Sequence, residues 1–233
     1  MIHYHGTPIT PKSQLARMTG RSFCIPFPRP ECLATCLRIG SSLMFDNGAF
    51  SAHTRGIRPD WTEYYRWLST ILAPPHWAVI PDVIDGDADQ QRGLIQQWPA
   101  EYGHLGAPVW HLGLPIDWLR ELCDRFPRVC FGSAGKYWQV GSDAWCGRMD
   151  EAFNALHKSG RLTWIHGLRM LGQVDGGWPL ASADSTNVAQ NFKARIGCAE
   201  CLADRLDGAN PALWWKPRDV QIDLISEAAD ALA

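Results

Sequence analysis

The sequence predicts one α/β domain over residues 1–233 that folds as a compact (β/α)8 barrel of the TIM type. Three observations lead to this prediction. Eight short strand-like runs recur along the chain, and helix-like stretches separate most of them. The chain is also long enough to bury a substantial core. The main alternative is an open, doubly wound sheet, but the phosphate loops GxGxxG and GxxxxGKS/T that usually accompany it are absent from the sequence.

The predicted strands are short apolar or β-branched runs that end at turn residues. They cover residues 2–6, 22–27, 42–46, 77–82, 108–113, 128–134, 162–168 and 179–184. Helix-like segments are recognised by apolar residues at helical spacing and by start and stop signals at their ends. They cover residues 59–72, 87–98, 115–126, 143–160, 187–197 and 219–233. Some connections are too short for a full helix, and the proline-rich segment 25–31 is predicted to be a loop.

The composition is that of a globular protein, with 46% hydrophobic and 20% charged residues. A net charge of −2 and a pI near 6.4 give no whole-protein signature of nucleic-acid binding, although a local basic groove can exist within such a total. The twelve tryptophans are unusual. Most are expected to pack in the core, and some could stack on bases.

The chain shows neither a secretory leader pattern nor an apolar run of the ~20 residues that a membrane span needs. A cytoplasmic protein is therefore expected, and its eight cysteines are expected to remain reduced. Cys198 and Cys201 form a CxxC pair that could supply half of a zinc site, but no second half lies nearby in the sequence.

Three aspartates end predicted strands: Asp46 before the turn Asn47-Gly48, Asp82, and Asp184. Each alone is explained by a turn or a helix cap. In a barrel of this type, however, all three would lie at one mouth, where chemistry takes place and where clustered carboxylates are costly. Asp46, next to an apolar strand and a second carboxylate, is expected to hold its proton more readily than Asp184.

Five short motifs occur in order between about residues 40 and 190: DNGAF at 46–50, PD at 81–82, WHLG at 110–113, FGSAG at 131–135 and SADST at 182–186. Together they resemble the tRNA-guanine transglycosylase superfamily. That family has a (β/α)8 barrel and exchanges guanine for a 7-deazaguanine through a covalent aspartyl–sugar intermediate. The spacing and the SADST form are more similar to its phage and bacterial DNA-modifying branch.

The resemblance implies a role for each matching residue. Asp184 would be the nucleophile and Asp46 the acid/base beside the scissile bond. Asp82 would accept from the purine N1–H and amine, and His111 stands where the family usually has a base-contacting glutamine. The remaining substrate-binding positions implied by the matching motifs are Asn47, Gly48, Phe50, Gly132, Ser133 and Ala134. Lys136, Arg169 and Lys193 follow strand ends, where they could neutralise phosphates.

The expected partners are DNA, with its target guanine single-stranded or flipped out, and a free 7-deazaguanine such as preQ0. Transfer RNA is the alternative nucleic acid. The reaction requires no metal or redox cofactor. If the protein is phage-encoded, the host cytoplasm is its location. Two other functions use the same features: a barrel hydrolase that cleaves an N- or O-glycosidic bond with water, and a non-catalytic barrel that binds nucleic acid or a modified base.

Overall fold

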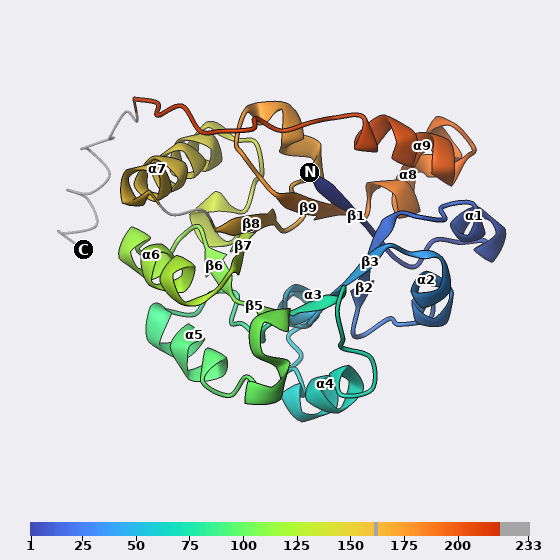
Figure 1. Ribbon diagram of the computed structural model, residues 1–233, viewed down its shortest axis with the longest axis horizontal. Coiled ribbons are helices and arrows are strands. Elements are labelled where there is room, and N and C mark those ends of the chain that lie inside the picture. Colours follow the sequence, from blue (N-terminus) through green and yellow to red (C-terminus); the bar gives the residue numbers. More distant parts are fainter. Residues whose placement is uncertain (161–162, 220–233) are drawn as a thin grey trace.

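A computed structural model describes residues 1–160 and 163–219. Nine parallel strands form a nearly closed barrel in the order β5-β4-β3-β2-β1-β9-β8-β7-β6, and helices surround it (Figure 1). The strands are β1 (Ile2–Gly6), β2 (Ser22–Pro26), β3 (Ser42–Asp46), β4 (Trp77–Val79), β5 (Gly106–Ala107), β6 (Val109–His111), β7 (Arg128–Gly132), β8 (Trp164–Gly167) and β9 (Ser182–Ser185). The TIM-type fold that the sequence predicts is thereby confirmed.

The nine strands occupy the eight strand positions of the barrel, because Pro108 divides the fifth strand into β5 and β6. β5 pairs with β4, and β6 pairs with β7. Proline has no N–H to donate, but its carbonyl still accepts a bond from Cys130 N at 2.8 Å. The predicted strand at 108–113 therefore begins two residues too late and misses this interruption.

Helices surround the barrel, except that α3 lies at its mouth (Figure 1). They are α1 (Lys12–Ala16), α2 (Leu33–Ile39), α3 (Ala49–Thr54), α4 (Trp61–Leu68), α5 (Ala88–Ile95), α6 (Ile116–Arg125), α7 (Asp143–Ser159), α8 (Asn187–Arg195) and α9 (Ala199–Asp207), with 3-10 turns η1 (Ala100–Leu105), η2 (Gly135–Tyr137) and η3 (Leu171–Gly176). Five predicted helices match α4 to α8. The predicted helix at 219–233 lies outside the described residues except for its first.

Side-chain caps explain where three of the predicted helices begin. Asp60 accepts from the Glu63 amide ahead of α4, and Ser142 accepts from the Trp145 amide ahead of α7. Asp87 forms a reciprocal capping box with Gln90 at α5. α1, α2, α3 and α9 were not predicted. The first three have only five to seven residues, too few for a clear helical period.

The strands alternate between two environments, as the period of two requires. On β3, Leu43 and Phe45 pack outward against the helices, whereas Met44 belongs to a cluster inside the barrel. That inner cluster contains Tyr4, Cys24, Met44, Trp77, Val79, Ala107, Val109 and Cys130. It fills the barrel and leaves the next inner position of several strands, such as Asp46 on β3, free to face the carboxyl-end mouth.

The C-terminal part of the described chain contacts two distant regions. At α9, Asp207 Oδ1 lies 3.0 Å from both His3 Nδ1 and His5 Nε2 of β1, which fastens the helix to the strand. The segment beyond α9 crosses toward α7 (Figure 1). There Trp215 Nε1 donates to Asn154 Oδ1 at 2.9 Å.

Two further sequence expectations bear on this part of the molecule. Cys198 and Cys201, expected to be reduced, are joined as a disulfide at the start of α9. A disulfide has no thiolate to offer a metal, so in this form the pair is not the zinc half-site that the sequence allows. Within residues 1–160 and 163–219, none of the helices has the length and apolar character needed to cross a bilayer.

Candidate active site

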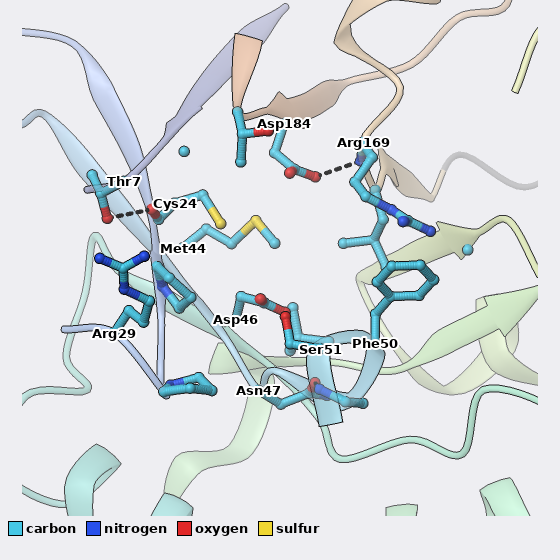
Figure 2. Close-up of a pocket in the computed structure, with 18 of the residues that line it drawn as sticks. Thr7, Cys24, Arg29, Met44, Asp46, Asn47, Phe50, Ser51, Arg169 and Asp184 are labelled. Carbon is cyan, nitrogen blue, oxygen red and sulfur yellow. Dashed lines mark hydrogen bonds between the residues drawn. The ribbon is translucent and has the colours of Figure 1, made fainter. Parts of the chain in front are cut away.

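A cavity of about 460 Å³ opens at the carboxyl ends of the strands. Asp46 ends β3, Asp82 follows β4, and Asp184 lies on β9, and all three line this cavity. Figure 2 shows the side chains of Asp46 and Asp184 facing the same space from different strands. The structure therefore brings together the three carboxylates that the sequence places at strand ends, as the barrel topology requires.

Asp46 is held at a sharp change in chain direction. Gly48 adopts a left-handed conformation with φ of 77°, and a Cβ there would lie 2.6 Å from the ring of Pro28. Only glycine fits both conditions, and the chain can then enter α3 directly. The Asn47 side chain completes the turn by accepting from the Ala49 amide at 2.8 Å. The DNG sequence is thus a strand-to-helix turn rather than a hairpin.

The pKa of Asp46 is raised from 3.8 to about 7. Burial is the largest cause, followed by the charge of Asp184, with Asp82 adding to the effect. A backbone hydrogen bond from Gly48 and the Arg169 cation oppose the rise. The part of Asp46 that remains exposed faces the cavity rather than the outer surface. The direction of the shift in the pKa is the one expected for Asp46, and it gives the site a carboxyl group that can both donate and accept a proton near neutral pH.

Asp82 is buried and held by two side chains. Asn47 Nδ2 donates to its Oδ1 at 2.7 Å and to the Ile80 carbonyl at 2.9 Å. His111 Nε2 lies 2.8 Å from its Oδ2. Both oxygens are therefore already bonded within the protein, and a ligand would have to use their remaining lone pairs.

His111 extends this network toward the cavity. A carboxylate only accepts, so His111 Nε2 donates to Asp82. Nδ1 is buried and has no hydrogen-bond partner among the described residues. A Cβ at Gly132 would lie 2.9 Å from it, so the glycine leaves room for the imidazole ring.

Asp184 has one fixed and one available oxygen. Its Oδ1 accepts from the Arg169 amide at 2.8 Å and lies 3.3 Å from His166 Nε2. In the described part of the chain, no hydrogen bond is made to Oδ2. Two contacts on one side of the carboxylate fix its orientation and leave the other oxygen available to a ligand in the cavity.

Arg169 is the only non-glycine residue with positive φ in the described chain, at 59°. This left-handed conformation costs on the order of 1–2 kcal/mol for a side chain with a Cβ. It aims the Arg169 amide at Asp184, and the guanidinium lies 3.7 Å from the centre of the exposed Phe50 ring. Arg169 Nη2 also donates to the Ser133 carbonyl at 3.3 Å. Figure 2 shows this cation beside Phe50 at the edge of the cavity.

The remaining predicted residues divide into two groups. Gly132 and Ser133 line the cavity, whereas Gly48 and Ala134 do not appear among its lining residues. The Ser133 hydroxyl accepts from Trp145 Nε1 at 2.9 Å and is thereby held by α7. Arg29 and Arg55 also line the cavity, so with Arg169 three arginines face three aspartates. Residues 1–160 and 163–219 contain no cluster of three His, Cys, Asp or Glu side chains suited to a metal ion.

Sequence reasoning missed two residues that contact the predicted nucleophile or its support, His166 and Ser182. The backbone role of Arg169 was missed as well. A signal was available: alternate residues of adjacent strands point inward together, so a His two residues before the end of one strand can meet an Asp on its neighbour. Neither a protein-family model nor a curated protein sequence matches this chain.

Proposed function

We propose that the protein is a guanine transglycosylase that replaces guanine in DNA with a 7-deazaguanine such as preQ0. One observation carries this proposal: two carboxylates in different environments share one cavity. Asp46 has a pKa near 7 and can carry the proton, while Asp184 directs one unbonded oxygen into the same space. A pair of this kind is what glycosidic-bond exchange requires.

In the first step, Asp184 Oδ2 attacks C1′ of the target nucleotide. The bond from C1′ to the purine nitrogen breaks, its electron pair goes to the purine, and Asp46 gives its proton to the departing guanine. In the second step, the 7-deazaguanine gives its ring N–H proton to Asp46, its nitrogen attacks C1′, and the bond to Asp184 breaks. Two displacements restore both carboxyl groups and retain the anomeric configuration.

The polar wall of the cavity supports recognition of a purine-like base. Asp82 lines the cavity and offers the remaining lone pairs of a buried carboxylate to ring and exocyclic N–H groups. Buried polar groups discriminate strongly, because a ligand that lacks the matching donor leaves them unpaired. Phe50 supplies an aromatic face at the rim. These features favour a planar heterocycle with several N–H donors.

The cations at the rim support a nucleic-acid substrate. Arg29, Arg55 and Arg169 line the cavity, where they are suited to the phosphates on either side of a nucleotide that enters it. A guanine within a duplex cannot reach carboxylates at the bottom of a pocket, so the nucleotide would enter flipped or single-stranded. No metal ion is required in either displacement.

The test is base exchange. Protein is incubated with DNA or tRNA that carries labelled guanine, with and without preQ0, and the released label and incorporated base are measured. Exchange into DNA that depends on preQ0 supports the proposal, with Asp184→Asn as the inactive control. Exchange into tRNA but not into DNA would show that the nucleic-acid substrate is tRNA. Release of guanine without an incoming base would instead indicate a hydrolase, and binding without release a non-catalytic protein.

A further inference from the structure

A chain of polar side chains lies behind Asp184 on β8 and β9, in which His166 and Ser182 are buried and Trp164 is half-buried. Trp164 Nε1 donates to Ser182 Oγ at 2.8 Å, and His166 Nδ1 lies 2.8 Å from the same Oγ. His166 Nε2 lies 3.3 Å from Asp184 Oδ1. The chain follows from strand register, because His166 pairs with Ser182. Trp164 lies two residues before His166 on β8, and Asp184 lies two residues after Ser182 on β9. Their side chains therefore lie on the same face as those of His166 and Ser182.

The direction of each hydrogen bond can be derived. An indole nitrogen only donates, so Ser182 Oγ accepts from Trp164. Asp184 Oδ1, as a carboxylate oxygen, also only accepts, so a neutral His166 ring must donate to it from Nε2, and Nδ1 then accepts the hydroxyl proton of Ser182. Burial lowers the pKa of His166, whose side chain is fully enclosed, so the ring is neutral and carries one proton. That proton lies on Nε2 and points at Asp184.

The surroundings hold the imidazole ring in this orientation. The ring of Tyr4 lies edge-on to His166 with centroids 5.7 Å apart, and the ring of Trp77 does the same at 5.0 Å. Trp77 Nε1 in turn donates to the Tyr4 hydroxyl at 2.8 Å. Rotation of the imidazole would require these packed rings to move.

We propose that the Trp164–Ser182–His166 chain fixes one tautomer of His166 and makes His166 a positioning residue for Asp184. His166 and the Arg169 amide together hold Oδ1, which leaves Oδ2 directed at the substrate. The inference deepens the proposed function, on which it rests in assigning Asp184 as the nucleophile. Its hydrogen-bond chain can be tested without any reaction.

The first test measures the tautomer. Nitrogen-15 NMR of the labelled full-length protein at neutral pH should show His166 protonated on Nε2 and unprotonated on Nδ1. In Ser182→Ala the donor to Nδ1 is lost, and the Nδ1 resonance should move away from its hydrogen-bonded position. A wild-type ring protonated on Nδ1 would overturn the proposal, whatever the exchange assay shows.

The second test separates positioning from packing. His166→Leu removes the donor to Asp184, and His166→Gln retains an N–H of similar reach. In His166→Leu the rate constant for glycosyl transfer to Asp184 should fall roughly 10- to 100-fold, the usual effect of losing a hydrogen bond to a charged group. The KM for preQ0 should stay within about twofold, and His166→Gln should recover part of the rate.

Circular dichroism and thermal unfolding of both variants show whether each is folded. Equal loss in the folded Gln and Leu variants, or a change confined to KM, would overturn the positioning role. If the wild-type protein performs no exchange, the proposed function fails and Asp184 loses its assignment, while the NMR result still decides the hydrogen-bond chain. The two failures are therefore distinguishable.

Discussion

Replacing Asp46 with asparagine should stabilise the protein at alkaline pH. The pKa of Asp46 rises from 3.8 in the unfolded chain to about 7 in the folded protein. Below pH 3.8 both states hold the proton. Between pH 3.8 and about 7 the folded state keeps a proton that the unfolded chain has lost, so stability falls as pH rises. Above about pH 7 both states are ionised and the full cost of the buried charge remains.

The magnitude follows from the size of the shift. Each pKa unit corresponds to 1.36 kcal/mol, so the interval between pH 5 and the folded pKa accounts for at most about 3 kcal/mol. Water in the cavity screens part of the charge, and we expect the free energy of unfolding of the wild type to fall by about 1 to 3 kcal/mol relative to Asp46→Asn between pH 5 and pH 8.

Urea unfolding of both proteins at pH 5 and pH 8 measures this difference. Asp117→Asn is the matched control, because it removes a carboxylate that is exposed on α6 and does not line the cavity. The control should follow the wild type at both pH values. Identical pH dependence in the wild type and Asp46→Asn would show that Asp46 ionises freely in the folded protein, and the assignment of Asp46 as proton carrier would fail.

Three further substitutions test other parts of the site. Arg169→Gly keeps the left-handed backbone and the hydrogen bond from the residue 169 amide to Asp184, but it removes the guanidinium. The free energy of unfolding should therefore stay within about 1 kcal/mol of the wild type, while the rate of base exchange falls at least about tenfold. A larger loss of stability in urea unfolding would show that the side chain has a structural role. Asp82→Ala should weaken guanine binding at least about tenfold in calorimetry, since it removes a buried acceptor, and unchanged affinity in a folded variant would exclude it from recognition. Gly48→Ala places a Cβ 2.6 Å from Pro28 at φ of 77°, so thermal unfolding should show a loss of about 1 to 3 kcal/mol, and a neutral effect would contradict the need for glycine at that turn.

Most of the fold could be predicted from the sequence, because the barrel depends on patterns that are local. Short apolar runs predict most of the strands, and capping residues such as Asp87 predict where helices begin. The break at Pro108 and the short helices α1 to α3 were missed for a physical reason. A helix of one or two turns, such as α1, α2 or α3, is too short to show a helical period in the sequence. A proline inside an apolar run, such as Pro108, does not show by itself whether the strand continues through it or is interrupted there.

The site was predictable only in part. Asp46, Asp82 and Asp184 could be placed together, because parallel strands end at one mouth of a barrel. For the bond from His166 to Asp184, strand alternation indicates only that both side chains point inward, and the register that brings them into contact is not apparent from either strand alone. The left-handed backbone of Arg169 has no sequence signature either, since arginine rarely adopts it.

Detection of a covalent bond between Asp184 and the sugar tests the central claim most directly. Wild-type protein, Asp184→Asn and Asp46→Asn are each incubated with guanine-containing DNA, with and without preQ0, and separated on a denaturing gel, and the modified peptide is identified by mass spectrometry. We predict an adduct on Asp184 in the wild type, none in Asp184→Asn, and slow turnover with a persisting adduct in Asp46→Asn. An adduct that survives in Asp184→Asn but disappears in Asp46→Asn would reverse the two roles, and the absence of any adduct in the wild type would contradict the covalent mechanism.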